Sequence, residues 1–344
     1  MAPRTNRKWT LKSRPKGMVS ESNFELVTEP TPELADGQVL VKTLLVAFDP
    51  AMRGWLDDRE SYVPPVGIGE VMRAAAVGQV VESASRKLAV GDLVTGTTGW
   101  QEYALVDLEH PTMFGSVTKL PEGATPEQAL SIFGITGLTA YFGLLDVGKP
   151  KEGDVVLVSG AAGATGSVAA QIARIKGASK VVGIAGGPEK CKWLVERAGL
   201  DAAIDYKSED VRRRMKEECP KGVDVFFDNV GGEILNAALV NMAQGGRIVL
   251  CGGISGYNAD SPPPGPSNIM ELVIRRCRME GFIVIDYLSR TAEAAADMAK
   301  WAASGELIAE VDVQEGMENV PGCLNRLFEG RNLGKQLCRV GEPE

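Results

Sequence analysis

The clearest pattern in the chain is a β-branched apolar run that ends in closely spaced glycines and gives way to apolar residues at helical spacing. The run covers residues 154–158, and the glycines that come after it are Gly160, Gly163 and Gly166. Beyond them, apolar residues recur at i, i+4 and i+7, namely Val168, Ile172 and Ile175. This spacing lets one helical face pack on a sheet. The pattern predicts a strand, a tight turn and a helix.

The chain before this run alternates short apolar segments with Gly, Pro and Asp, as strands joined by turns do. Strands are expected at residues 39–46, 75–82, 92–95 and 102–106. This first part therefore indicates a β-rich, barrel-like domain. Residues 130–145 mix apolar side chains with glycines and indicate a helical hinge that leads into the second part.

The chain after the hinge alternates strands with helical segments, which is typical of a doubly wound parallel sheet with right-handed crossovers. Its strands are expected at residues 155–158, 180–185, 202–205, 223–228, 246–251 and 279–285. Residues 260–266 hold four prolines and predict a surface loop. Helices are expected at 291–305 and near 320–328, and we expect the tail from residue 307 to rejoin the first domain.

The glycine turn has a chemical interpretation. Glycine lets the backbone approach a pyrophosphate, and the free N–H groups and dipole of a helix start favour negative charge. The spacing Gly160-x-x-Gly163-x-x-Gly166 differs from the most common dinucleotide fingerprint. The flanking strand and helix nevertheless favour a dinucleotide site. The alternative is a glycine turn that serves only close packing of the strand on the helix.

The type of cofactor depends on the residues that come after the second strand. An NAD site has an acidic side chain about twenty residues past the glycines, which takes the ribose hydroxyls. Here that place holds Gly186 and Gly187, while Lys190 lies on the next helix and Tyr206 ends the following strand. An ammonium and a phenol hydroxyl suit a 2′-phosphate. NADPH is therefore favoured over NADH, unless Lys190 is merely solvated and Tyr206 is a core side chain.

The length and charge of the chain indicate its number of domains and exclude some classes of binding partner. A chain of 344 residues exceeds the usual size of one core, so two domains are expected. The net charge of −8 argues against a general binder of nucleic acid or anionic membranes. Residues 1–16 are basic and polar, unlike a secretory signal, and no apolar run reaches the ~18 residues of a membrane span. We expect a cytoplasmic protein.

Metal and hydrolase chemistry are disfavoured by the residues available. The six cysteines have no close pair, and His110 is the one histidine. Zinc sites need clustered Cys, His and carboxylate ligands, so no metal site is expected. A Ser-His-Asp or Cys-His hydrolase would have to use His110, which precedes Pro111 in a loop-like stretch and is expected to be exposed.

Several segments together closely resemble the zinc-free medium-chain dehydrogenase/reductases. These segments are residues 137–145, 161–167, 227–232, 253–258 and 331–335. The most similar group comprises the prostaglandin reductases and leukotriene hydroxydehydrogenases, the plant alkenal double-bond reductases and the bacterial curcumin reductases. The resemblance spans nearly the whole chain.

The resemblance implies a Rossmann doubly wound parallel sheet and a β-rich, GroES-like barrel domain in an α/β protein, usually a homodimer. The discontinuous catalytic domain would comprise residues 1–132 and 308–344, and the NADPH-binding domain residues 133–307. The implied reaction is NADPH-dependent reduction of the carbon–carbon double bond of α,β-unsaturated ketones and aldehydes, without a metal. Hydride would go to the β-carbon of a small-molecule enone or enal.

The resemblance also assigns site residues. The predicted cofactor-binding residues are Gly163, Ala164, Thr165, Gly166, Gly186, Lys190, Tyr206, Asn229, Cys251, Gly252, Tyr257 and Asn332. Tyr257 is the candidate catalytic residue, because its hydroxyl can donate to the enolate oxygen or protonate the α-carbon. The alternative is that Tyr257 only packs on the cofactor.

The predicted substrate pocket contains Ala51, Arg53 and Trp100. Arg53 has the alternative role of fixing a loop. Many relatives carry tyrosine at the position of Ala51, whereas the bacterial curcumin reductases are similar to this chain there. A smaller side chain opens the pocket and removes a polar contact, so the substrate preference of the tyrosine-bearing members does not carry over.

Three other functions remain to be distinguished. A quinone reductase of the same superfamily would share the cofactor site, and a zinc alcohol dehydrogenase is opposed by the missing ligands. A protein that binds NADPH as a sensor without turnover would share the fold, because fold alone does not imply function.

Overall fold

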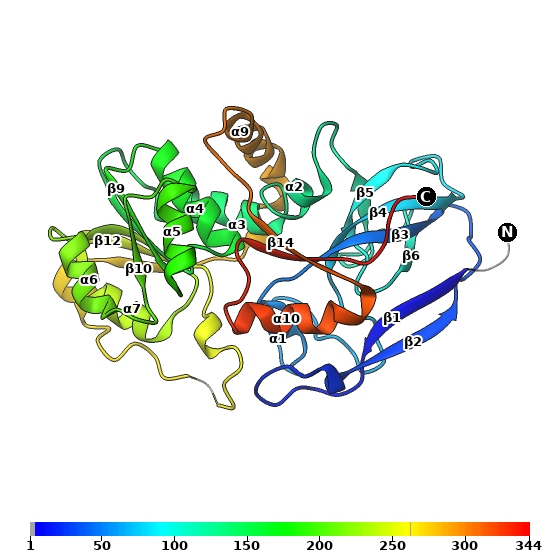
Figure 1. Cartoon of the computed structure of the whole chain (residues 1–344), viewed down its shortest axis with the longest axis horizontal. Coiled ribbons are helices and arrows are strands. Elements are labelled where there is room, and N and C mark those ends of the chain that lie inside the picture. Colours follow the sequence, from blue (N-terminus) through cyan, green and yellow to red (C-terminus); the bar gives the residue numbers. More distant parts are fainter. Residues whose placement is uncertain (1–3, 262) are drawn as a thin grey trace. The chain divides into compact units, whose positions relative to one another are not determined.

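The computed structural model describes residues 4–261 and 263–344. The chain forms two compact units, one made of Met1–Leu130 with Val311–Glu344 and the other of Ser131–Glu310 (Figure 1). The polypeptide thus leaves the first unit, builds the second without interruption and returns.

The second unit is built on a parallel sheet with the strand order β10-β9-β8-β11-β12-β13. The strands are β8 (Val155–Ser159), β9 (Lys180–Ala185), β10 (Ala202–Asp205), β11 (Val223–Asp228), β12 (Met242–Leu250) and β13 (Arg278–Gly281). Neighbouring strands run parallel throughout. Numbered within the unit, this is the order 3-2-1-4-5-6, which confirms the predicted Rossmann fold.

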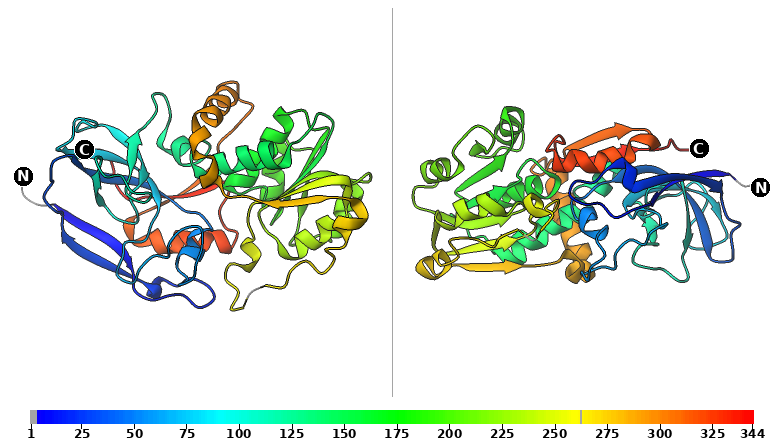
Figure 2. Two further views of the ribbon diagram at one scale, coloured as in Figure 1. Left: turned by 180° about the vertical axis from the view of Figure 1, so that it is seen from behind. Right: turned by 90° about the horizontal axis from the view of Figure 1, so that it is seen from below.

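Helices cover both faces of this sheet (Figure 2). They are α3 (Ile135–Phe142), α4 (Ala164–Ile175), α5 (Pro188–Glu196), α6 (Val211–Glu218), α7 (Gly232–Leu239), α8 (Glu271–Arg275) and α9 (Thr291–Ala303). Because both faces are covered, the central strands are buried over almost their whole length; Val181–Val182 and Phe226–Phe227 are 0% exposed. This double burial explains why these strands are continuous apolar runs in the sequence.

The last predicted strand of this unit is too long. The sequence predicts it at residues 279–285, but β13 ends at Gly281, and residues 284–290 form a 3₁₀ helix instead. Gly281 pairs with Leu250, the final residue of β12. Beyond that pair β13 has no neighbouring strand to follow, so the apolar run leaves the sheet.

The hinge segment is helical, as expected at residues 130–145. It contains α3, which continues directly into a π-helix at Gly143–Gly148. A Cβ atom on Gly137 would lie 1.8 Å from the carbonyl oxygen of Ile132, so the helix start needs glycine there. The described residues of the proline-rich segment 260–266 form neither helix nor strand, and residue 262 lies outside the described part of the chain.

The first unit contains a mostly antiparallel sheet with the order β14-β15-β3-β4-β5-β7, in which β6 also pairs with β3. Its strands are β3 (Gln38–Ala47), β4 (Ala75–Ser83), β5 (Leu93–Thr97), β6 (Tyr103–Asp107), β7 (Val117–Lys119), β14 (Val311–Glu315) and β15 (Lys335–Arg339). The tail strand β15 pairs antiparallel with β3, so the C-terminal tail shares a sheet with strands from the first part of the chain.

The described part of this unit also contains an antiparallel ribbon, three α-helices and two short 3₁₀ helices. The ribbon consists of β1 (Thr5–Leu11) and β2 (Phe24–Pro30), and the helices are α1 (Met52–Trp55), α2 (Pro126–Leu130) and α10 (Val320–Phe328). The predicted helix at 320–328 is confirmed. Strand β1 was not predicted, because its sequence TNRKWTL carries polar and charged residues among few apolar ones.

A buried ion pair ties the tail to the segment that carries Ala51 and Arg53. Lys335 on β15 is 1% exposed, and its Nζ lies 2.6 Å from Oδ1 of Asp49, whose side chain is 14% exposed. The pair lies within the first unit and fixes the start of the Asp49–Arg53 segment. Removing one partner of a buried pair leaves an uncompensated charge and is strongly destabilising.

We therefore expect Lys335→Met to lower the free energy of unfolding by about 3–5 kcal/mol, measured by chemical denaturation. The Lys335→Met/Asp49→Asn double variant is the control, since it removes the unpaired charge as well. It should recover a substantial part of the loss. Equal destabilisation of the single and double variants would contradict the role given to the unpaired charge.

Candidate cofactor and substrate sites

The turn between β8 and α4 is close-packed in a way that requires glycine. Gly160 has φ +57°, a backbone conformation that L side chains rarely adopt. A Cβ atom on Gly166 would lie 2.3 Å from the carbonyl oxygen of Gly160 and 2.9 Å from Cα of Ala161. The alternative interpretation, that these glycines serve strand–helix packing, therefore accounts for both of these positions.

The start of α4 has a property that packing does not explain. Gly163 begins the helix, and within the described residues no side chain caps it. Gly163, Ala164 and Thr165 are partly exposed, whereas Gly166 is buried. Uncapped N–H groups and the helix dipole form a site for an anion. Gly166 is therefore required for packing, whereas the three preceding residues remain partly exposed at the uncapped helix start.

A second group of predicted residues meets at the ends of β9 and β10. A Cβ atom on Gly186 would lie 2.8 Å from Cε1 of Tyr206 and 2.9 Å from Cε of Lys207. Tyr206 is 45% exposed, so it is not the core side chain that the alternative required. Lys190, in the first turns of α5, is half-buried. The structure therefore places the side chains of Tyr206 and Lys207 beside Gly186, and Lys190 follows on the helix that begins at Pro188.

The third group lies where the strand order reverses, between β8 and β11. Ser159 ends β8, and its Oγ donates to Oδ1 of Asp228 at 2.6 Å. The Asp228 carboxylate also accepts the N–H groups of Val230 at 3.0 Å and Gly231 at 3.1 Å. Burial raises the pKa of the Asp228 carboxyl above its ordinary value, while these hydrogen bonds oppose the shift.

Asp228 and Ser159 form hydrogen bonds with three of the predicted cofactor residues, Asn229, Cys251 and Gly252. The N–H of Asn229 donates to Ser159 Oγ at 2.8 Å, and its Nδ2 donates to the Ser159 carbonyl at 2.7 Å. The N–H groups of Cys251 and Gly252 donate to the Asp228 carbonyl at 2.9 and 3.1 Å. Burial and the nearby Asp228 carboxylate raise the pKa of the Cys251 thiol, which favours its protonated form at neutral pH.

An open groove of about 630 Å³ borders this group. Its lining residues come from the ends of β11, β12 and β13 and from α7, and include Asp228, Leu235, Cys251, Gly252 and Phe282. Sequence reasoning missed Ser159 and Asp228. The signal available was a polar residue at the carboxyl end of each of two apolar strands, which is where ligands bind in open parallel sheets.

Tyr257 belongs to the same group. It follows the 3₁₀ helix Ile254–Gly256, and its hydroxyl oxygen accepts the N–H of Gly253 at 3.1 Å. A Cβ atom on Gly252 would lie 3.1 Å from that oxygen and 3.3 Å from the Asn229 carbonyl oxygen. The structure therefore brings together Asn229, Cys251, Gly252 and Tyr257 at one edge of the sheet.

The first unit holds the other predicted residues. Ala51 is partly exposed and precedes α1. Arg53 is 4% exposed; its guanidinium donates to Asp57 Oδ1 at 2.6 Å and to the Gly17 carbonyl at 3.2 Å, so it does fix a loop. Asn332 is 7% exposed and donates from Nδ2 to the Gly334 carbonyl at 2.8 Å, within the turn that leads into β15.

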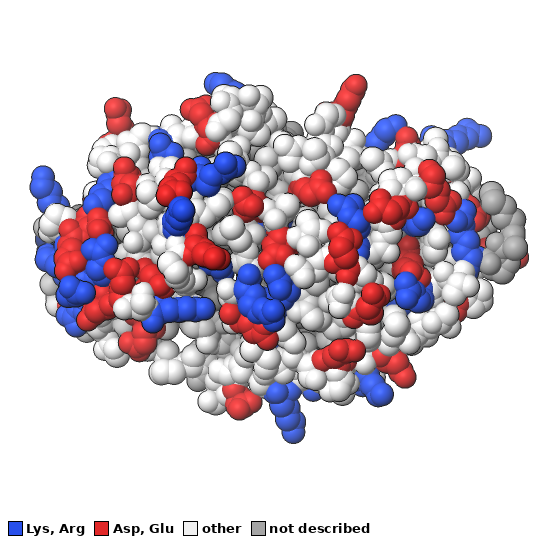
Figure 3. All heavy atoms as spheres, viewed as in Figure 1, with Lys and Arg blue, Asp and Glu red and all other residues white. Residues whose placement is uncertain are grey.

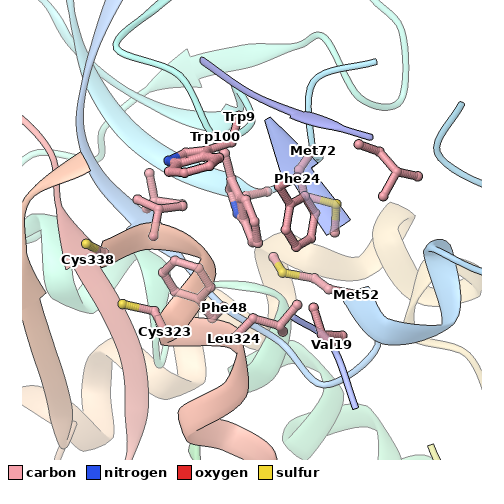
Figure 4. Packing of buried hydrophobic residues seen from close by; sticks show 14 of the residues in the cluster. Trp9, Val19, Phe24, Phe48, Met52, Met72, Trp100, Cys323, Leu324 and Cys338 are labelled. Atoms are coloured by element: carbon pink, nitrogen blue, oxygen red, sulfur yellow. The ribbon is translucent and has the colours of Figure 1, made fainter. Parts of the chain in front are cut away.

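Trp100 does not line a pocket in this structure, contrary to the prediction. It is 0% exposed and packs against Phe24 and Phe48, with ring centroids 5.0 and 5.6 Å away (Figure 4). The surrounding apolar cluster also contains Met52 and Met72. A large aromatic ring that follows a turn can suggest a ligand contact, but burial of its apolar area in the core is the stronger effect here.

Neither a metal site nor a membrane helix is present in the described residues. Across residues 4–261 and 263–344, no group of three or more His, Cys, Asp and Glu side chains is arranged to hold a metal ion. His110 has a side chain that is 87% exposed, beside Asp107. None of the described helices combines the length and apolar character that a membrane span needs. On the face drawn in Figure 3, acidic and basic side chains are interspersed.

Comparisons with known proteins agree with this arrangement. Residues 7–113 match the family described as the N-terminal domain of oxidoreductase, and residues 164–302 match the family described as zinc-binding dehydrogenase. The chain is 38% identical over 340 residues to the NADPH-dependent curcumin reductase of Escherichia coli, covering 97% of each chain. It is 38% identical over 343 residues to the NADP⁺-dependent 2-alkenal reductase of Nicotiana tabacum, covering 98% of each.

A solved structure is similar over the same extent. The crystal structure of CurA from Vibrio vulnificus in complex with NADPH superimposes with a TM-score of 0.91 at 41% identity, covering 98% of this chain and all of that one.

Proposed function

The chain belongs to the zinc-free medium-chain dehydrogenase/reductases, in the group of the prostaglandin, alkenal and curcumin reductases, and we propose that it reduces carbon–carbon double bonds with NADPH. Its substrates would be α,β-unsaturated ketones and aldehydes. The observation that carries the proposal is the assembly of Gly163–Thr165, Gly186 with Tyr206, and Asn229 with Tyr257 along the carboxyl edge of one parallel sheet. Nucleotide cofactors bind at this edge in such folds.

The residues present fit NADPH. The uncapped start of α4 suits the pyrophosphate, and Lys190 and Tyr206 supply a cation and a hydroxyl for the 2′-phosphate. A side chain on Gly186 would meet the Tyr206 ring, so glycine keeps the space beside that ring open. We further propose that Asn229, Cys251, Gly252 and Asn332 contact the cofactor toward its nicotinamide end.

The chemistry divides between cofactor and protein. Bound NADPH supplies the hydride that adds to the β-carbon of the substrate. Negative charge then develops on the carbonyl oxygen, and a fixed hydrogen-bond donor stabilises it. We assign this role to Tyr257, because a phenol is protonated at neutral pH. The bond from the Gly253 N–H fixes the phenol oxygen and polarises the O–H bond. The α-carbon takes its proton from Tyr257 or from water.

The substrate side is assigned to the segment that begins at Asp49. Ala51 is small and partly exposed, which leaves room for bulky substrates. The buried Arg53 side chain fixes the position of this segment through its hydrogen bonds to the Gly17 carbonyl and the Asp57 carboxylate.

We also propose a cytoplasmic location and a homodimer. All six cysteines lie in the described part of the chain and are free thiols, as in a reducing compartment. Strand β13 is the outer strand of its sheet as described, and the segment before it exposes a set of large apolar side chains: Ile269, Met270, Val273 and Ile274. Two copies related by a twofold axis would cover this surface on both.

The experiment that tests the reaction monitors NADPH oxidation against an enal, a linear enone, a bulky dienone such as curcumin, and a quinone, with NADH in parallel. We expect turnover of the enal and the enones with NADPH and identification of the saturated carbonyl compound as product. Turnover of the quinone alone would favour the quinone reductase. NADPH binding without any turnover would favour a sensor.

The role of Tyr257 predicts a particular split of kinetic constants. Tyr257→Phe should lower kcat about 10²-fold, as loss of one oxyanion donor does, with little change in KM for NADPH. Tyr206→Phe is the matched control and should mainly raise KM for NADPH. An unchanged kcat in Tyr257→Phe would assign stabilisation and protonation to another group or to solvent.

The dimer proposal predicts the effect of a charge on the apolar surface. Val273 is 65% exposed, and Val273→Asp should convert the dimer to a monomer in sedimentation velocity because an aspartate would be buried unpaired at the interface. Val195→Asp, at a valine that is 43% exposed on α5, should leave the dimer intact. A wild-type monomer, or a Val273→Asp dimer of unchanged affinity, would contradict the proposed interface.

A further inference from the structure

One buried carboxylate joins the loop that precedes α5, the helix of Lys190, to the loop that contains Tyr206. Asp205 is the last residue of β10 and is 9% exposed. Its Oδ1 accepts the N–H of Gly187 at 2.7 Å and the N–H of Lys207 at 3.0 Å, and its Oδ2 accepts the hydroxyl of Ser208 at 2.8 Å. Gly187 precedes α5, which carries Lys190, while Lys207 and Ser208 come directly after Tyr206.

These contacts fix the geometry around Gly186. The N–H of Tyr206 donates to the Ala185 carbonyl at 3.1 Å, so the β9–α5 loop is held to the β10–α6 loop on either side of Gly186. Gly187 has φ +98°, a conformation that favours glycine, and its N–H donates to the Asp205 carboxylate. We call the bonds of the Asp205 carboxylate the Asp205 clamp; Tyr206 and Lys207 make their close approach to Gly186 beside it.

Judged by its charge alone, Asp205 would weaken the binding of a 2′-phosphate. An anionic side chain in the loops that receive a 2′-phosphate repels it, and in NAD sites a carboxylate accepts the ribose hydroxyls instead. Here backbone and hydroxyl donors already bind both carboxylate oxygens. Together they hold the pKa of Asp205 below its ordinary value, with the Gly187 N–H as the main cause, so the clamp is ionised.

We propose that Asp205 is a positioning residue for the 2′-phosphate, and that its clamp contributes to the preference for a 2′-phosphorylated nucleotide. The proposal rests on the NADPH function above. It assigns specificity to a carboxylate that does not touch the nucleotide but sets the spacing of Lys190 and Tyr206. Geometry and charge therefore predict opposite effects when Asp205 loses its charge.

The test measures binding of adenosine 2′,5′-bisphosphate and of AMP by calorimetry at constant ionic strength, which requires no turnover. In Asp205→Asn an NH₂ group replaces one acceptor oxygen and faces a donor. We expect affinity for the bisphosphate to fall at least tenfold and affinity for AMP to change less than threefold. Asp210→Asn is the matched control: it removes an equal charge from an exposed residue nearby, and asparagine can still cap α6. Its bisphosphate affinity should be unchanged or slightly higher.

Two results would overturn the proposal. Equal or tighter binding of the bisphosphate by Asp205→Asn would mean that the carboxylate acts by repulsion. Equal losses for both nucleotides would mean that it serves only the fold. Ser208→Ala breaks one of the three bonds and keeps the charge of Asp205. Its affinity for the bisphosphate should fall by a smaller factor than in Asp205→Asn, with affinity for AMP again little changed. This variant keeps the test usable even if Asp205→Asn is too unstable. Wild-type protein that binds both nucleotides equally would instead contradict the NADPH proposal itself.

Discussion

The hydrogen bond between Ser159 and Asp228 is the interaction on which the proposed site depends. It joins the carboxyl ends of β8 and β11, the two strands between which the order of the sheet reverses. Asp228 is 0% exposed, and burying a carboxylate is costly. The bonds from Ser159, Val230 and Gly231 offset that cost only in the observed conformation of the loop after β11. In that same conformation Asn229, Cys251, Gly252 and Tyr257 lie close together.

The proposed cofactor site uses backbone and close approach more than charged side chains. The turn after β8 needs glycine at residues 160 and 166 for its own packing, and that packing leaves the start of α4 open to an anion. Space beside Tyr206 likewise depends on the missing side chain of Gly186. The role assigned to Tyr257 needs only a hydroxyl donor at a fixed position. The proposed double-bond reduction could therefore proceed with an uncharged phenol stabilising the enolate oxygen.

Sequence patterns predicted the parts of the fold that repeat a local rule. The strands β9, β10 and β11 have the predicted bounds, because strands covered on both faces are continuous apolar runs between breaks. The end of β13 was not predictable, since it is set by the end of its neighbour β12.

The prediction for Trp100 was wrong because its burial depends on Phe24 and Phe48, which are distant in sequence. Asp205, Ser159 and Asp228 were missed for the same reason, since the bond from Gly187 to Asp205 and the bond from Ser159 to Asp228 each join segments that are distant in sequence. The proposed cofactor residues could be named from resemblance, whereas the hydrogen bonds around Asp205 and Asp228 are visible only in the three-dimensional structure.

The most direct test of the account is the fate of a labelled hydride. The protein is supplied with NADPH deuterated at the transferable position of the nicotinamide C4, together with a linear enone, and the product is analysed by NMR and mass spectrometry. If the chain reduces the carbon–carbon double bond, the product is a saturated ketone with one deuterium on the β-carbon and none on the carbonyl carbon. An allylic alcohol with deuterium on the carbinol carbon would contradict the proposal, because the chain would then be a carbonyl reductase.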